Sequence, residues 1–375
     1  MEGILRDFLF YYNKGYSYYT AGKFKYALNN FSKSILLNNQ YAESYYYRGL
    51  INLKFKNYKN ALEDFKKNYF LDNKNSISIY YQGVCQFEML YMKPALKLFK
   101  KMLFINPFHV DSMNYIGLIQ ISFNNLKAAI KIFKKIIKLD TQNFSVHLHL
   151  ALIYQQTGNF KKALDNYVKA NELNPDDLSI SLDIGECFYE LNDYENAEFY
   201  LSFYLNSCKI FYTDIYFKLG VCYYELSLFE ESIHFLNKFI RSSRNNRTAY
   251  YFRGLSKWNL DYLNEAVTDL KKSINVEEDE YDFTLYLISK IYYESNNLKL
   301  SFKYINEAIK IDKNYPNYYY IRAQIYNKLG NFKKADRDLS TAVKIDNHFK
   351  NNYLSRGKVV VLGLIQNEKQ KIKEQ

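Results

Sequence analysis

The residues of this chain best suited to nucleophilic or metal chemistry are its four cysteines, and three of them share one setting. Cys85, Cys187 and Cys222 each lie two residues after a glycine, in GVC, GEC and GVC. A cysteine that returns at one position of similar segments is typical of a small buried apolar residue, so we expect these thiols to pack in a core. Cys208 stands alone, and the sequence contains no C-x-x-C pair. The pattern therefore predicts no metal site.

Histidines and phosphate-binding loops do not supply an active site either. His147 and His149 are two residues apart, which places them on different faces of a helix, and we expect both at the surface or in a groove. The chain has no G-x-G-x-x-G segment and no P-loop. We therefore expect no catalytic residue, no cofactor and no small-molecule substrate.

A segment rich in tyrosine recurs along the chain. Near copies of YYYRGL, at 45–50, occur at 250–255, 318–323 and 353–358. The arginines of these copies are separated by 205, 69 and 34 residues, which are close to multiples of 34. Within the first copy, we expect the stem of Arg48 to be packed and its guanidinium to lie at an edge. The spacing indicates a repeated structural unit rather than a ligand-binding motif.

Small residues follow the same period in two series. The first series lies at Gly15, Gly49, Gly83, Gly117, Ala151, Gly185, Gly220, Gly254, Ser289, Ala323 and Gly357. The second series, twelve positions later, lies at Ala27, Ala61, Ala95, Ala129, Ala163, Ala197, Ser232, Ala266, Ser301 and Ala335. Small side chains at both positions allow two paired helices to approach closely, so the period predicts a helix pair in each unit.

These residues and their spacing resemble the tetratricopeptide repeat, a helix–turn–helix unit of 34 residues. The fifth unit matches the family pattern at Leu150, Ala151, Tyr154, Ala163, Tyr167, Ala170 and Pro175. The resemblance implies an all-α fold, a right-handed superhelical α-solenoid of helix–turn–helix repeats. We place ten repeats at 8–41, 42–75, 76–109, 110–143, 144–177, 178–211, 213–246, 247–280, 282–315 and 316–349. Residues 1–7 form a lead, and 350–375 form a capping helix and a charged tail.

Position 15 of each repeat ends the first helix and favours residues that tolerate left-handed backbone. Residues of this kind occur at Gly22, Asn124, Gly158, Asn192, Asp261, Asn296 and Gly330. Lys56, Leu90 and Ser227 depart from the pattern.

The resemblance also predicts a binding groove, because positions 2, 5, 6, 9, 12 and 13 of the first helices line a concave surface in the family. Aromatic residues there offer a large contact area with few rotatable bonds, which suits recognition of an extended peptide or a partner helix. The predicted groove residues are Tyr12, Tyr19, Tyr46, Tyr47, Tyr80, Tyr81, Phe87, Tyr189, Phe217, Tyr224, Tyr251, Trp258, Tyr286, Tyr293 and Tyr320.

Lysines form a second candidate surface. Residues 1–175 carry 24 basic and 11 acidic side chains, whereas 176–280 carry 10 and 19, and 281–375 carry 17 and 9. The predicted basic ridge consists of Lys25, Lys59, Lys93, Lys127 and Lys161 at position 18, with Lys66, Lys67, Lys100, Lys101, Lys134 and Lys135 at positions 25 and 26. We interpret the ridge as a surface for an acidic protein, and a merely solvated face is the alternative.

The function predicted from these features is a non-catalytic scaffold or adaptor for protein complexes. Long arrays of this kind resemble subunits of ciliary trafficking coats, axonemal and cytoskeletal assemblies and cell-cycle ligases, which implies a cytoplasmic protein. A regulatory subunit of a separate enzyme is one alternative, and an RNA-binding helical-repeat protein is a weaker one because the acidic middle segment would repel phosphate. We also expect no secretion signal and no membrane span.

Overall fold

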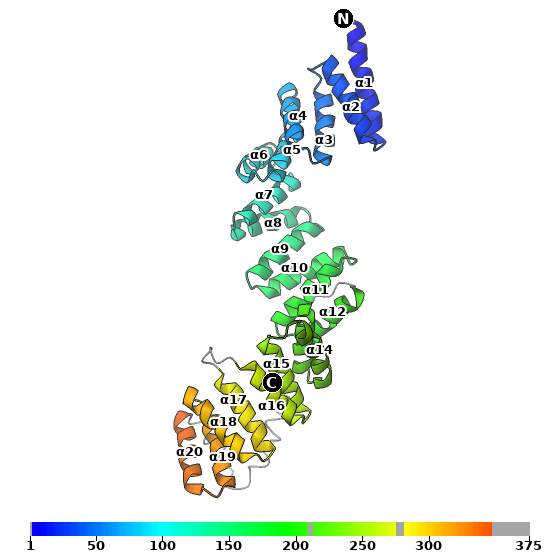
Figure 1. Ribbon diagram of the computed structural model, residues 1–375. Helices are drawn as coiled ribbons and strands as arrows, with labels where there is room; N and C mark the ends of the chain where they lie inside the picture. The colour runs from blue at the N-terminus through cyan, green and yellow to red at the C-terminus, as the bar shows by residue number, and fades with distance from the viewer. Residues whose placement is uncertain (1, 209–212, 275–280, 347–375) are drawn as a thin grey trace. The chain divides into compact units, whose positions relative to one another are not determined.

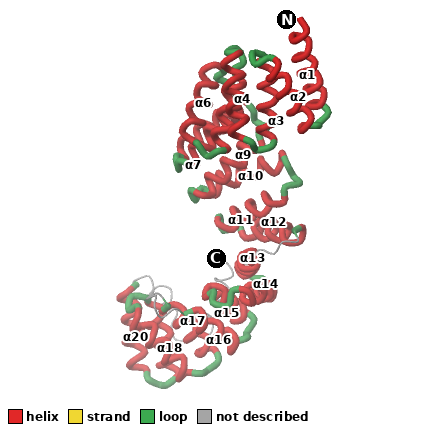
Figure 2. Tube along the Cα trace, turned by 45° about the horizontal axis from the view of Figure 1, so that its top comes forward, coloured by secondary structure: helices red, strands yellow, loops and turns green. Residues whose placement is uncertain are grey.

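The computed structural model describes residues 2–208, 213–274 and 281–346, and these segments consist of α-helices joined by short turns (Figure 1). Figure 2 shows only helix and loop over this part of the chain. The predicted all-α fold of helix–turn–helix units is therefore confirmed. The predicted capping helix and charged tail, 350–375, lie outside the described residues. None of the helices described here is both long and apolar enough to cross a bilayer.

The first of two compact units ends at Pro175, and its described helices form five consecutive pairs. They are α1 (Glu2–Thr20), α2 (Phe24–Leu37), α3 (Ala42–Lys54), α4 (Tyr58–Leu71), α5 (Ile77–Glu88), α6 (Met92–Ile105), α7 (Val110–Ser122), α8 (Leu126–Leu139), α9 (Phe144–Gln156) and α10 (Phe160–Leu173). Inside the unit, each second helix packs on the first helix of its own pair and on the first helix of the next pair. Because α1 begins at Glu2, residues 2–7 continue the first helix of the first repeat.

The second unit begins at Asp176 and contains five further pairs in its described residues. They are α11 (Leu178–Glu190), α12 (Tyr194–Ser207), α13 (Thr213–Glu225), α14 (Phe229–Ser242), α15 (Arg247–Asn259), α16 (Leu263–Ser273), α17 (Asp282–Glu294), α18 (Leu298–Ile311), α19 (Pro316–Lys328) and α20 (Phe332–Ile345). The same alternation of contacts joins them into a stack. From the second repeat onward, each first helix begins within one residue of the start that the 34-residue period predicts.

The turn inside each pair has left-handed backbone at position 15, whatever residue occupies it. Lys56, Leu90 and Ser227, which depart from the sequence pattern, have φ values of 61°, 65° and 62°. Directly after Leu90 in the sequence, the backbone N–H of Tyr91 donates to the carbonyl of Gln86 at 2.8 Å, which completes a Schellman motif. The geometry of the helix pair therefore overrides the local preference of these three side chains.

The core of each pair forms where a small residue faces a large one. In the first unit, a Cβ added to Gly83 would lie 2.7 Å from Cε1 of the fully buried Phe99, and Gly49 faces Phe65 in the same way. In the second unit the large partner is smaller, as where Gly220 faces Leu236. Glycine at position 8 is thus required by the close approach of the ring or leucine at position 24.

Candidate functional site

The structure leaves none of the predicted groove residues fully exposed. Tyr12, Tyr19, Tyr46, Tyr47, Tyr80, Tyr81, Phe87, Tyr189, Phe217, Tyr224, Tyr251 and Tyr320 are half-buried. Trp258, Tyr286 and Tyr293 are buried. These rings therefore take part in the packing of the first helices.

Position 6 shows how this packing works in the first unit. Tyr47 stacks on the core ring of Phe31, with 5.7 Å between centroids and 14° between planes. Tyr81 stacks on Phe65, with 5.0 Å between ring centroids and 16° between ring planes. In each pair the core ring comes from the preceding repeat, so one face of the tyrosine stabilises the interface between repeats.

Burial also sets the protonation state of the groove tyrosines. Burial raises the pKa of Tyr189 to about 12, and it raises the pKa of Tyr46 and Tyr251 above the ordinary value as well. The phenol groups are therefore neutral at physiological pH, and each can donate a hydrogen bond.

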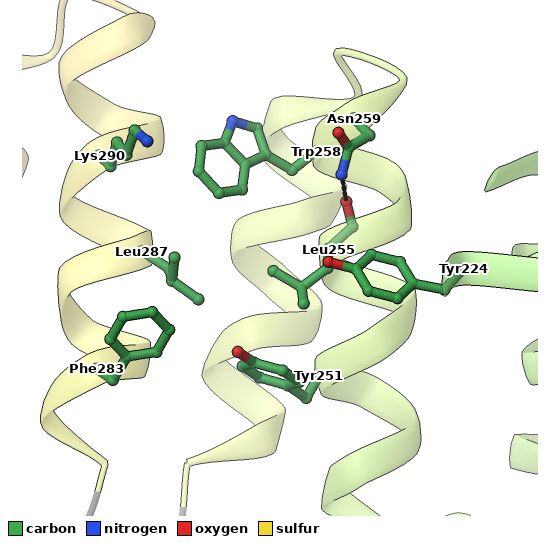
Figure 3. A pocket seen from close by; sticks show the side chains of 8 residues that line it. All are labelled: Tyr224, Tyr251, Leu255, Trp258, Asn259, Phe283, Leu287 and Lys290. Carbon is green, nitrogen blue, oxygen red and sulfur yellow. Dashed lines mark hydrogen bonds between the residues drawn. The ribbon is translucent and has the colours of Figure 1, made fainter. Parts of the chain in front are cut away.

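A cavity of about 190 Å³ lies in the second unit between α13, α15 and α17 (Figure 3). Its lining consists of Tyr224, Tyr251, Leu255, Trp258, Asn259, Phe283, Leu287 and Lys290. All eight occupy positions 2, 5, 6, 9, 12 or 13 of their repeats, which are the positions that line the groove in the family. The sequence prediction included Tyr224, Tyr251 and Trp258 but missed the other five, because it followed aromatic residues at positions 5 and 12.

The cavity wall is mostly apolar, with polar groups gathered around the indole ring. Phe283 and Leu287 of α17 point toward α15 (Figure 3). Nζ of Lys290 lies 5.3 Å from the ring centre of Trp258. The indole Nε1–H donates to the Glu294 carboxylate at 2.7 Å. A ligand would thus meet an apolar floor beside a fixed indole ring and a buried ammonium group.

The size of the cavity limits what it can hold. Sites for drug-sized molecules measure about 300–1,000 Å³. The 190 Å³ cavity is closer to an apolar cavity of about 150 Å³ that binds one benzene molecule. One aromatic or branched aliphatic side chain therefore fits the cavity better than a cofactor does.

The predicted basic ridge lies at the surface of the first unit. All eleven of its lysines are exposed except Lys67, which is half-buried with Nζ 5.1 Å from the ring centre of Phe70. Among the described residues, no carboxylate lies within 4.0 Å of a ridge ammonium group. The ridge therefore keeps its positive charge available to a partner.

The arginines at position 7 bind carboxylates of the paired helix. The sequence prediction placed the Arg48 guanidinium at an edge and named no such partner. That guanidinium instead binds the buried carboxylate of Asp64, with Nη2 2.6 Å from Oδ1. The pairing recurs sixteen residues apart in two more repeats, as Arg253–Asp269 and Arg322–Asp338. The recurring spacing of arginine and aspartate was the available signal, and its role is to join helices rather than to bind a ligand.

The residues singled out for possible chemistry are structural. Burial raises the pKa of the Cys85, Cys187 and Cys222 thiols to about 12, so these cysteines remain protonated in the core. His147 is buried, and its ring nitrogens lie 3.2 Å from Asn166 Oδ1 and from the Thr141 carbonyl, so the prediction of a surface or groove position is wrong for this residue. His149 is half-buried at position 6 of its repeat, which agrees with that prediction. Within the described part of the chain, no cluster of three His, Cys, Asp or Glu residues could hold a metal ion.

Comparison with known families gives a consistent match. Sequence profiles described as tetratricopeptide repeats match residues 12–75, 110–143, 144–177, 213–246, 248–280, 284–315 and 316–349. No curated protein matches the chain.

Among solved structures, the C-terminal part of a TPR repeat-containing protein from Cytophaga hutchinsonii is 16% identical, with a TM-score of 0.52 over 64% of this chain and 97% of that chain. A tetratricopeptide repeat protein from Parabacteroides merdae is 15% identical, with a TM-score of 0.47 over 67% and 99%. MamA from Desulfovibrio magneticus is 20% identical, with a TM-score of 0.43 over 46% and 97%. The Cytophaga structure supports the solenoid fold alone.

Proposed function

This chain belongs to the tetratricopeptide repeat family, and we propose that it is a non-catalytic scaffold that binds a segment of another protein in the groove of its first helices. Proteins of this family generally mediate protein–protein interactions. The observation that carries the proposal is the cavity beside Trp258, because it lies on the groove-lining positions and has the volume of one large side chain.

The bound segment anchors one aromatic or branched aliphatic residue between Leu255 and Leu287. Such anchors in desolvated pockets supply most of the binding energy of a protein interface. The phenol of Tyr251, which lines the cavity, can donate a hydrogen bond to the backbone or to a carboxylate next to the anchor. The segment therefore has an apolar anchor with a hydrogen-bond acceptor beside it.

The test is a selection of peptides from a phage-displayed random library on the full-length protein. Trp258 is the only tryptophan in the chain, so its emission reports directly on the cavity. We expect the selected peptides to share an aromatic, leucine or isoleucine residue and to change the Trp258 emission when they bind.

A variant that fills the cavity provides the control for specificity. In the first unit, position 6 carries tyrosines that fill the layer between repeats, so Leu287→Tyr places a residue of the same kind in the cavity. We expect this variant to bind the selected peptides at least about 10-fold more weakly, since the anchor would lose its burial. Leu329→Tyr, at an exposed site outside the cavity, should bind like the wild type. Peptides without a common anchor, or with equal affinity for Leu287→Tyr, would contradict the proposal.

The identity of the partner decides which assembly the protein joins, whether ciliary, axonemal, cytoskeletal or of the cell-cycle type. Proximity labelling in cells followed by cross-linking mass spectrometry identifies that partner. Cross-links that place the partner segment beside the cavity would support the groove as the binding surface, and cross-links confined to the ridge lysines would contradict it.

A further inference from the structure

The second helices of the first four repeats have an unusually one-sided charge. Together α2, α4, α6 and α8 contain fourteen lysines, which number two, three, four and five in turn. Their only carboxylates are Glu63, which is exposed, and Asp64, which is buried against Arg48. The charged side chains on the outer surface of these helices are therefore almost all positive.

Large apolar side chains project from the same surface. Leu36, Phe70 and Phe104 occupy position 29 of three consecutive repeats and are 84%, 77% and 89% exposed. At 100° per residue, positions 18, 25 and 29 of a helix lie within about 40° of one another and opposite the buried positions 20, 24 and 27. The apolar tip and the lysines at positions 18 and 25 thus share one outward face in α4 and α6, whereas α2 has a single lysine on that face and α8 has lysines alone.

The exposed lysines and apolar residues of neighbouring second helices lie at equivalent positions of their repeats. Successive repeats differ by only a small rotation, so the same position in adjacent repeats lies along one side of the unit. Lys66, Lys100 and Lys134 at position 25 and Leu36, Phe70 and Phe104 at position 29 define what we call the lysine–aromatic face.

We propose that the lysine–aromatic face binds an anionic phospholipid surface. Lysines provide attraction to acidic headgroups, and each lysine near a membrane strengthens binding by a factor of about five. Leucine and phenylalanine tips enter the boundary between headgroups and acyl chains, so the face supplies both of the signals that peripheral binding requires. Side chains that project almost entirely into solvent suit a soft lipid surface better than a protein partner, whose interface needs well-packed pockets. This inference is independent of the groove.

Co-sedimentation of the full-length protein with lipid vesicles tests the proposal. We expect binding to equimolar phosphatidylcholine–phosphatidylserine vesicles, much weaker binding to phosphatidylcholine alone, and a loss of binding as salt increases. The triple variant Lys66→Gln, Lys100→Gln, Lys134→Gln should lower the partition constant about 100-fold. The double variant Phe70→Ser, Phe104→Ser should lower it about 10-fold or more, since both rings lose their apolar insertion.

Matched variants in the second unit control for total charge and for exposed apolar residues. They are Lys299→Gln, Lys310→Gln, Lys333→Gln as one triple and Phe199→Ser, Phe332→Ser as one double, all at exposed sites. Both should bind vesicles like the wild type. All of these sites are on the surface, so circular dichroism should show an unchanged helix content.

Equal binding to both kinds of vesicle, or equal losses in the face variants and their controls, would overturn the proposal. So would a wild-type protein that ignores anionic vesicles but is retained by immobilised polyglutamate, which would assign the face to an acidic protein instead. Peptide binding measured by Trp258 emission should be unchanged in the face variants, so the failure of one proposal is distinguishable from the failure of the other.

Discussion

Replacing Asp269 by asparagine tests the idea that arginine–aspartate pairs join the two helices of a repeat. The Asp269 carboxylate accepts hydrogen bonds from Nε and Nη2 of Arg253 at 2.7 and 2.6 Å, and from Nζ of Lys257 at 2.7 Å. Nη1 of Arg253 donates to Asn237 of the preceding repeat at 2.6 Å. Because α14, α15 and α16 meet at this cluster, Asp269→Asn leaves two cations facing each other without a counter-charge.

The expected loss in the free energy of unfolding follows from the burial of the cluster around Asp269. Removing one partner of a buried ion pair costs about 3–5 kcal/mol, because the remaining charge stays in a poorly solvated site. The side chains of Arg253 and Lys257 are 13% and 18% exposed, so they can recover some hydration. We therefore expect a loss at the low end of that range, about 3 kcal/mol in the free energy of unfolding. For a unit of about 200 residues this lowers the melting temperature by about 10 °C.

The loss depends on pH in a direction that the cluster determines. Burial alone would raise the pKa of Asp269, but the hydrogen bonds and charges of Arg253 and Lys257 hold it below its ordinary value. A carboxyl with a lowered folded-state pKa contributes stability above its unfolded pKa of about 4, and the contribution disappears as the pH falls through the folded value. The stabilities of the wild type and Asp269→Asn should therefore converge as the pH falls below the ordinary range of an aspartate pKa.

Circular dichroism melting at neutral and acid pH measures both effects, and hydrogen exchange in α15 and α16 localises them. Asp336→Asn in α20 is the control, because Asp336 is exposed and should shift the unfolding free energy by less than about 0.5 kcal/mol. A change in Asp269→Asn no larger than in this control would refute the role assigned to the pair. If Asp269→Asn is as much less stable than the wild type at acid pH as at neutral pH, the electrostatic origin of the stability loss is refuted.

Three further predictions concern the turns, the core and the thiols. Leu90→Gly should stabilise the protein by about 0.5–1 kcal/mol in urea unfolding, since glycine relieves the left-handed backbone, whereas Leu90→Ala should bring no gain. Gly83→Ala should destabilise it by about 1–3 kcal/mol in the same assay, because the added methyl group overlaps the Phe99 ring; an unchanged midpoint would contradict this close packing. With a thiol reagent at pH 8, Cys187 should react only after unfolding, whereas the half-buried Cys208 should react in the folded protein; equal rates would contradict the burial that raises the Cys187 pKa.

The fold could be predicted from the sequence because its strongest constraints act at short range. A small residue, whether glycine, alanine or serine, is needed at positions 8 and 20 where two helices approach closely, so small residues recur with the full period of the repeat. The left-handed turn at Leu90 could not be predicted from that residue, because the backbone there is imposed by the helices on either side. The ion pair of Arg48 was missed for a related reason, since its aspartate lies sixteen residues away on the paired helix.

The exposure of the ridge lysines could be predicted from the sequence, whereas the shape of the cavity could not. Lysines of the ridge are exposed as expected, since a charged side chain on an outer helical face has no alternative to solvent. The exposure of the apolar residues Leu36, Phe70 and Phe104 could not be predicted from the sequence. A large apolar residue near the end of a helix is expected in the core unless the packing shows otherwise. The cavity beside Trp258 depends on the sizes of side chains from three helices at once, which no single periodic series describes.

Position 6 of the repeat is one of the positions that shape the cavity. At position 6 of the second and third repeats, Tyr47 and Tyr81 stack on the core rings of Phe31 and Phe65 and fill the layer between neighbouring first helices. In the ninth repeat the same position is Leu287, a shorter side chain that lines the cavity instead. The size of the side chain at position 6 therefore contributes to the cavity, together with the other residues of α13, α15 and α17 that line it. This is also why a tyrosine at Leu287 should remove the pocket while leaving the helix pairs intact.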